Sequence, residues 1–326
     1  MWNDDPILVS GGALHGEVSP VFRLTGYFPY RQAHPYLMPE RWQGLLNCFL
    51  PVVREHCDKI IVWDRPGAKA RRSKRISNAD WRPFHLLSSL ESDIESGIFT
   101  GFSFLDRADA LEGNGRGPCS VRFFVGSSIR FEACISLQDW ATGRLSIPEL
   151  IAAVQALPYV SVMAGFGLSL GERYAGPDAE ATYSALSDYA ARYPVVDVAR
   201  DDERSFFPGS PQDYPLIGIG GINWLTGIGE PFRSRAGGAD TLAAQAPADV
   251  QVADGPFGTL FTLGTGPISG EAGVDDAGLP LYTWLAKQIA AVWSPGEDDP
   301  RAPVFGRTAK SKSLAWERRF YDAAVQ

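Results

Sequence analysis

Short apolar segments that come in pairs, each pair joined by a turn, constrain the fold of this chain more than any other feature of its sequence. Two such segments occupy residues 119–137 around Gly126-Ser127-Ser128, and two more, 249–254 and 258–265, meet at Asp254-Gly255. Turns this short join neighbouring antiparallel strands, so both regions predict β-hairpins. By the same patterning we expect further strands at 20–28, 59–63, 98–105, 159–170 and 215–222.

Segments with helical periodicity lie between these strands. Across residues 40–56 apolar side chains recur every three or four positions, which predicts an amphipathic helix that Pro51 would kink or shorten. Ser146 and Glu149 have the spacing of a capping box and predict the start of another helix. The helices expected after residue 140 span about 146–157, 178–192, 279–293 and 314–325.

Paired strands with helices at intervals are typical of the α+β class. We therefore predict a mixed, largely antiparallel sheet, or two such sheets, packed with helices. Residues 1–140 form a strand-rich N-terminal half, and residues 141–326 form a half that is richer in helices. A domain boundary near residue 140 and one continuous domain both fit this distribution.

The charge of the chain argues against one class of function. The formal net charge is −8 and the pI is about 5.1, whereas a general nucleic-acid binder needs a basic face. An acidic surface suits a basic partner, although mild acidity is equally typical of soluble proteins. The stretch Arg65–Arg75 holds six basic residues and no acid; it is interpreted as a solvated loop, with an anion or nucleic-acid contact as the alternative.

The ends and the cysteines of the chain indicate where it works. The N-terminus lacks the positively charged and apolar regions of a secretory signal, and there is no run of 18 apolar residues. The four cysteines, Cys48, Cys57, Cys119 and Cys134, contain no C-x-x-C pair, which indicates reduced, buried thiols. We expect a cytoplasmic protein without membrane contact.

Signatures of enzyme chemistry are weak. No histidine has a metal ligand at the usual spacing, so neither a metal nor a cofactor is expected. The glycine-rich segments 218–223 and 264–270 approach the dinucleotide fingerprint but each departs from it. Residues 201–203 form a charged run rather than a dispersed acid–base pair. A nucleotide-binding enzyme that uses one of the glycine segments remains the alternative hypothesis, and no catalytic residue is assigned.

Four segments of the second half resemble a known family. They are Arg192-Tyr193-Pro194-Val195-Val196-Asp197, Gly220 to Gly229 with Asn223-Trp224-Leu225-Thr226, Gly278-Leu279-Pro280-Leu281-Tyr282, and Trp316-Glu317-Arg318-Arg319-Phe320. In order and spacing they are similar to motifs of the type VI secretion immunity proteins, whose named members protect against nuclease effectors with a VRR-Nuc domain. The resemblance covers about residues 145–325.

This resemblance implies a non-enzymatic cytoplasmic inhibitor that binds and blocks its cognate secreted toxin, most simply a nuclease, by occluding the active site. The oligomeric state is left open. Since a nuclease groove is basic, acidic residues are the candidates for toxin contact: Asp201, Asp202 and Glu203, followed by Glu271, Asp275 and Asp276. Trp224 is expected in the core, and Asn223 at a strand-to-helix turn.

Overall fold

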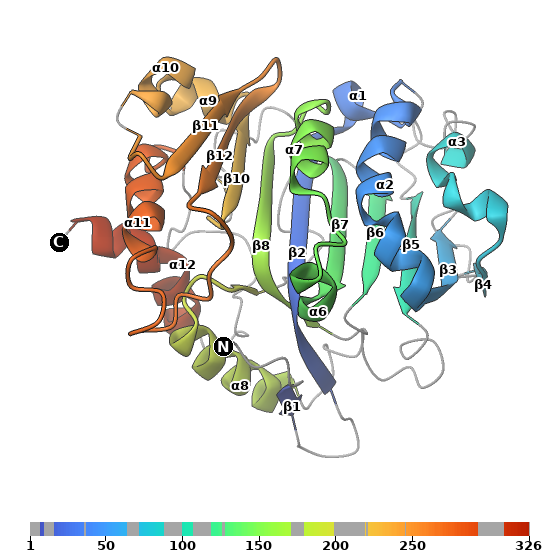
Figure 1. Cartoon of the computed structure of the whole chain (residues 1–326), viewed down its shortest axis with the longest axis horizontal. Helices are drawn as coiled ribbons and strands as arrows, with labels where there is room; N and C mark the ends of the chain where they lie inside the picture. The colour runs from blue at the N-terminus through green and yellow to red at the C-terminus, as the bar shows by residue number, and fades with distance from the viewer. Residues whose placement is uncertain are drawn as a thin grey trace.

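A single twelve-stranded sheet runs through the protein (Figure 1). The structure is a computed structural model. It describes residues 7–9, 16–35, 37–63, 72–87, 100–106, 119–125, 128–170, 179–198, 219, 221–244, 246–292 and 310–325. Among the described strands every pairing is antiparallel except that of β8 with β9, and helices pack on the sheet, so the predicted α+β class is confirmed.

Ten strands follow one another across the sheet. From one edge to the other they are β11 (Val250–Asp254), β12 (Gly258–Leu263), β10 (Leu225–Gly229), β8 (Ser161–Leu170), β2 (Gly16–Pro29), β7 (Ser128–Ser136), β6 (Ser120–Val125), β5 (Thr100–Asp106), β3 (Cys57–Trp63) and β4 (Arg72–Arg75). Beside this path, β1 (Ile7–Val9) pairs with β2, and β9 (Asp197–Val198) pairs with β8. Both predicted hairpins are present, as β6–β7 and β11–β12.

The central strand β2 joins the two halves of the sequence. Leu24 is in register with Ala133 of β7 on one side and with Ala164 of β8 on the other. Strands from before and after residue 140 therefore lie in one hydrogen-bonded sheet. The buried apolar side chains also form one cluster that extends from Phe22 to Phe320.

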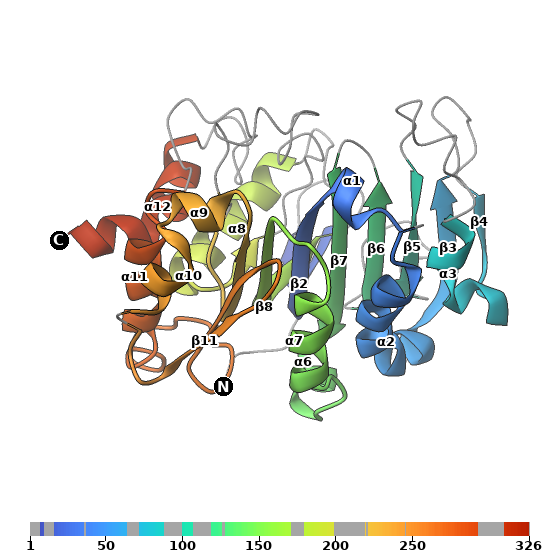
Figure 2. The ribbon, with the colours of Figure 1, turned by 90° about the horizontal axis from the view of Figure 1, so that it is seen from above.

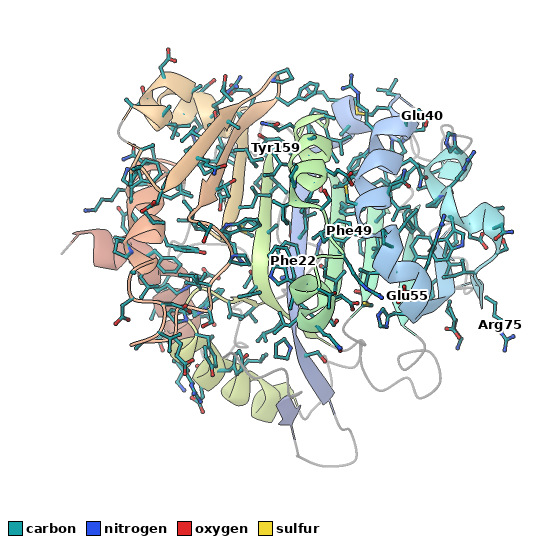
Figure 3. All side chains as sticks on the ribbon, viewed as in Figure 1. Phe22, Glu40, Phe49, Glu55, Arg75 and Tyr159 are labelled. Carbon is teal, nitrogen blue, oxygen red and sulfur yellow. The ribbon has the colours of Figure 1, made fainter. Side chains whose placement is uncertain are left out.

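One face of the sheet is covered by α2 (Pro39–His56), α6 (Leu137–Ala141) and α7 (Ile147–Gln155), which lie together on one side in Figure 2. The aromatic side chains Phe22 and Phe49, labelled in Figure 3, belong to the buried layer of this region. Trp42 of α2 packs against Phe28 and Phe123 with ring centroids 4.6 and 4.9 Å apart. The periodic apolar residues of α2 are all buried, which confirms the predicted helix face.

Three longer helices lie beside the other half of the sheet. Helix α12 (Lys310–Val325) contacts both α8 (Ala179–Arg192) and α11 (Leu279–Gln288). In Figure 2, α8 and α12 lie on the side away from α6 and α7. The other short helices in the described part of the chain are α1 (Tyr30–Ala33), the 3-10 turn η1 (Asn78–Trp81), α3 (Pro83–Leu87), α9 (Phe232–Arg235) and α10 (Gly238–Ala243).

Two helices have the ends that the sequence predicts, since α2 reaches His56 and α7 begins directly after Ser146, although their local details differ. Pro51 does not end α2, which continues to His56; its ring is exposed, so the backbone carbonyl that loses its partner lies on the solvent side. Ser146 precedes α7 but its side chain makes no capping hydrogen bond. The cap hydrogen bond is found instead at Ser136, whose hydroxyl accepts from Asp139 N at 3.0 Å.

Of the strand expected at 215–222, the structure describes only residues 219, 221 and 222. Residues 221–223 have no regular structure, and the strand β10 begins only at Leu225. Asn223 N donates to Thr226 Oγ1 at 3.0 Å, and this hydroxyl donates to Asn223 O. These bonds close a turn just before the strand, so Asn223 stands at the start of a strand rather than before a helix. Residues 215–218 and 220 lie outside the described residues, as do Gly126 and Ser127 of the predicted hairpin turn.

The basic stretch Arg65–Arg75 ends in the edge strand of the sheet. Residues 65–71 lie outside the described residues, and 72–75 form β4, which pairs with β3 on one side only. Arg75, at the right-hand edge of Figure 3, is exposed. Basic residues on an edge strand oppose pairing with the edge of another sheet, which gives this end of the stretch a structural role.

Candidate functional site

Three of the four motif segments named above meet at one corner of the molecule. Arg319 of α12 donates through Nε to the carbonyl oxygen of Pro194. The rings of Tyr282 in α11 and Phe320 in α12 lie 5.5 Å apart, and both side chains are buried. These motif residues hold helices and loops together. The motifs therefore indicate a shared fold rather than a surface that contacts a partner.

The fourth segment stabilises the sheet. Asn223 Oδ1 accepts from Trp224 N at 2.7 Å, while Asn223 Nδ2 donates to the carbonyl oxygen of Phe166 in β8 at 3.0 Å. Trp224 is buried, with its ring 5.9 Å from Trp140 and 6.4 Å from Phe22. The prediction that Trp224 belongs to the core is confirmed.

The loop between β12 and α11 brings three of the predicted acidic residues together. The carboxylate oxygen Oδ2 of Asp275 accepts from the backbone N of Ser269 at 3.0 Å and of Gly270 at 2.8 Å, and from Ser269 Oγ at 2.7 Å. Asp276 Oδ1 accepts from Gly273 N at 2.9 Å. The carboxylates thus fix the shape of the segment from residue 271 to residue 276, which we call the acidic loop.

The outer surface of the acidic loop combines charge with one apolar side chain. Val274 is 64% exposed and is one of only two large hydrophobic side chains with high exposure among the described residues. Glu271 receives two hydrogen bonds from Arg192, at 2.8 and 3.2 Å. The guanidinium of Arg192 also lies 5.0 Å from the ring centroid of Tyr193. The loop therefore presents an apolar tip between carboxylates.

Comparison with known proteins agrees with the motifs. The sequence profile of the family described as "Type VI immunity for VRR-NUC" matches residues 147–320, more than half of the chain.

This chain belongs to that type VI immunity family.

Among solved structures, the "T6SS protein PA0821" of Pseudomonas aeruginosa has the same fold, with a TM-score of 0.69 at 17% sequence identity. The alignment covers 98% of the present chain and 91% of the other. No curated protein matches the chain. Within the described part of this immunity-family protein, no helix is both long enough and apolar enough to span a membrane.

The other predicted contact residues of this immunity-family protein, Asp201, Asp202 and Glu203, lie outside the described residues. Of the remaining three, Asp275 and Asp276 accept bonds from the loop itself and Glu271 pairs with Arg192. Asp275 therefore organises the acidic loop and Val274 and Asp276 lie on its outer surface, while Glu271, whose side chain is 22% exposed, lies half-buried beside Arg192.

In the glycine segment 264–270, the backbone N–H groups that could hold a phosphate are already bonded to a side chain of the same loop. The backbone N–H groups of Ser269, Gly270 and Glu271 all point at Asp275 Oδ2. A Cβ on Gly270 would lie 2.8 Å from Cγ2 of Val195, so this backbone packs closely on its neighbour. A bound phosphate needs backbone N–H groups of this kind left open, and here an internal carboxylate takes them. In the segment 218–223, residues 218 and 220 lie outside the described residues.

A buried ion network that joins β2, β7 and β9 was not predicted from the sequence. Arg23 of β2 donates to Glu132 of β7 at 3.1 Å and to Asp197 of β9, and Arg130 donates to Glu132 at 2.6 Å. Burial alone would lower the pKa of Arg23, but the carboxylates of Asp197 and Glu132 raise it above its ordinary value. Arg23 therefore stays charged and ties three strands together.

A polar cleft of about 690 Å³ lies between α2, η1 and α3. Its lining includes Gln43, Arg54, Trp81, Arg82 and His85. Arg54 lies over the ring of Trp81, 5.3 Å from its centroid, and Gln43 Nε2 donates to Trp81 O at 2.9 Å. Because the lining mixes basic groups with Glu40, whose carboxylate is 3.4 Å from His85 Nε2, the cleft shows no clear preference for either charge.

Proposed function

We propose that this protein is a cytoplasmic, non-catalytic inhibitor that protects its cell by binding a cognate VRR-Nuc effector nuclease of type VI secretion and occluding its active site. Membership of the type VI immunity family carries the proposal. The match to residues 147–320 includes the acidic loop as well as the motif segments that support it.

We further propose that the acidic loop enters the substrate groove of the nuclease. A groove that binds nucleic acid is lined with basic groups, and Glu271 and Asp276 offer carboxylates of opposite charge. Val274 supplies an apolar anchor at the tip. The bonds made by Asp275 hold the loop in shape before binding, which lowers the entropic cost of association. The run 201–203 is proposed as a second acidic contact, from charge alone.

The experiment pairs the purified protein with its cognate effector and measures both affinity and residual nuclease activity. We expect the double variant Glu271→Lys/Asp276→Lys to bind at least tenfold more weakly and to release nuclease activity, because attraction becomes repulsion in the groove. Asp275 is left unchanged so that its carboxylate keeps the bonds to the backbone of Ser269, Gly270 and Glu271, while the variant loses the Asp276–Gly273 bond and the pair with Arg192.

The matched control is Glu40→Lys/Asp240→Lys, which makes the same change in charge at exposed positions on α2 and α10. We expect its affinity to stay within about twofold of the wild type. Equal weakening by both double variants would mean that net charge matters rather than the loop. Unchanged affinity in the loop variant would remove the acidic loop from the interface, and a wild-type protein that binds without inhibiting would contradict occlusion.

A further inference from the structure

Three side chains able to bind a metal meet at the C-terminal end of α2, far from the acidic loop in the sequence. They are His56, Cys119 and Asp139, and one potential ligand atom from each lies within 4.8 Å of the other two. His56 Nε2 is 3.2 Å from Asp139 Oδ2. All three residues precede the segment matched by the immunity family, so the family does not account for the cluster.

The fold fixes these side chains from three separate segments. His56 is the last residue of α2, Cys119 stands immediately before β6, and Asp139 lies in the first turn of α6. Cys57 Sγ donates to the carbonyl oxygen of Cys119 at 3.7 Å, which holds the Cys119 backbone against the end of α2. Glu55, labelled in Figure 3, marks this end of the helix.

Neighbours hold both carboxylate oxygens of Asp139, and the oxygen bound by Ser136, Oδ2, also faces His56. Ser136 Oγ accepts from Asp139 N at 3.0 Å and donates to Asp139 Oδ2 at 2.5 Å. Arg144 binds the other oxygen, Oδ1, at 3.3 Å and pairs with Glu55 at 2.5 Å. Metal sites commonly have such outer contacts, which set the direction of the ligands.

We propose that His56, Cys119 and Asp139 bind a zinc ion, with water as the fourth ligand. An imidazole nitrogen, a thiolate and a carboxylate are the ligands that Zn²⁺ takes, whereas Mg²⁺ and Ca²⁺ prefer oxygen alone. Tetrahedral ligands about 2.0–2.3 Å from the ion lie roughly 3.3–3.8 Å from one another. The His56–Asp139 separation of 3.2 Å is close to that spacing, and the thiol needs to move by no more than about 1 Å.

Binding exchanges protons for the metal. The Cys119 thiol releases its proton to become a thiolate, and His56 binds through an unprotonated Nε2, so the ion lies between His56 Nε2, Asp139 Oδ2 and Cys119 Sγ. The His56 side chain is 37% exposed and Asp139 is 9% exposed, while Cys119 is fully buried. The ion therefore enters from the histidine side, and the sulfur closes the inner side of the site.

The test is a titration of the metal-free, full-length protein with Co²⁺, whose bond to a thiolate gives a charge-transfer absorption band in the near ultraviolet. We expect one equivalent of Co²⁺ to produce the band and Zn²⁺ to abolish it by displacement. Cys119→Ser removes the band, and His56→Gln and Asp139→Asn each weaken metal binding by at least tenfold. Near-ultraviolet circular dichroism checks that each variant is folded.

The matched control is Cys48→Ser. Cys48 is also a buried thiol, but it lies in the middle of α2, where its Sγ donates to Gly44 O at 3.4 Å, away from the cluster. We expect this variant to keep the band at full intensity. Zinc should raise the unfolding midpoint of the wild type and of Cys48→Ser, but not that of Cys119→Ser. A wild type without the band, or a band that survives in Cys119→Ser, would overturn the proposal and leave a His56–Asp139 contact beside a packed thiol. Because toxin inhibition is not the readout, this outcome is independent of the proposed immunity function.

Discussion

At the scale of single residues, the contact between Gly165 and Asn223 decides whether two neighbouring strands can approach. Asn223 bonds the backbone of Trp224 and of Phe166 at once, and its amide group lies directly over Gly165 in β8. A Cβ at residue 165 would clash with Asn223 Oδ1. The absence of a side chain at this position is therefore a requirement of packing.

We expect Gly165→Ala to lower the free energy of unfolding by about 1–3 kcal/mol, since the added methyl group must displace Asn223 and break its bonds. Urea denaturation followed by tryptophan fluorescence measures the change. Gly266→Ala is the control, because a Cβ there meets no atom within 4 Å, and we expect it to stay within about 0.5 kcal/mol of the wild type. Similar losses in both variants would point to a general effect of alanine.

Single residues also show which contacts could not be predicted from the sequence. Charge alone drew attention to Asp275, but only the folded loop shows that its carboxylate turns inward to three backbone N–H groups. His56, Cys119 and Asp139 are separated by long stretches of sequence, so a search for ligands at short spacing could not connect them. Arg23 stands between Phe22 and Leu24, an alternation that predicts a solvent-exposed charge, whereas the side chain is 4% exposed.

At the scale of elements, the ion network around Arg23 and Glu132 bonds β2, β7 and β9 through side chains in addition to the backbone ladders. Periodicity was sufficient to predict α2, both hairpins and the terminal helix. It did not predict β10, which begins at Leu225 after a turn closed by bonds between the Thr226 hydroxyl and the Asn223 backbone. The order of strands could not be predicted either, since β2 pairs with strands more than 100 residues away in the sequence.

We expect Glu132→Gln to lower the free energy of unfolding by about 3 kcal/mol, because removing one partner leaves buried guanidinium groups without enough negative charge. Arg192→Gln, which breaks the exposed pair with Glu271, should leave the free energy of unfolding almost unchanged. Urea denaturation of the two variants beside the wild type gives the comparison. A small effect of Glu132→Gln would show that water or a neighbouring group replaces the carboxylate.

At the scale of the whole molecule, the shared sheet predicts cooperative behaviour. We expect the two sequence halves to unfold together, since β2 cannot lose β8 without exposing the common core. Native-state hydrogen exchange should give the same opening free energy for the protected amides of β5 and β6 as for those of β10 and β12. Clearly different values for the two sets would divide the protein into two independent folding units near residue 140.

The central position of β2 also affects the timing of biosynthesis. Ribosomes add roughly 5–20 residues per second, and β2 ends at Pro29 while its two neighbours end at Ser136 and Leu170. The strand at the middle of the sheet is thus translated on the order of ten seconds before both of its neighbours exist. A newly made chain therefore cannot complete the middle of its sheet until Leu170 has been translated.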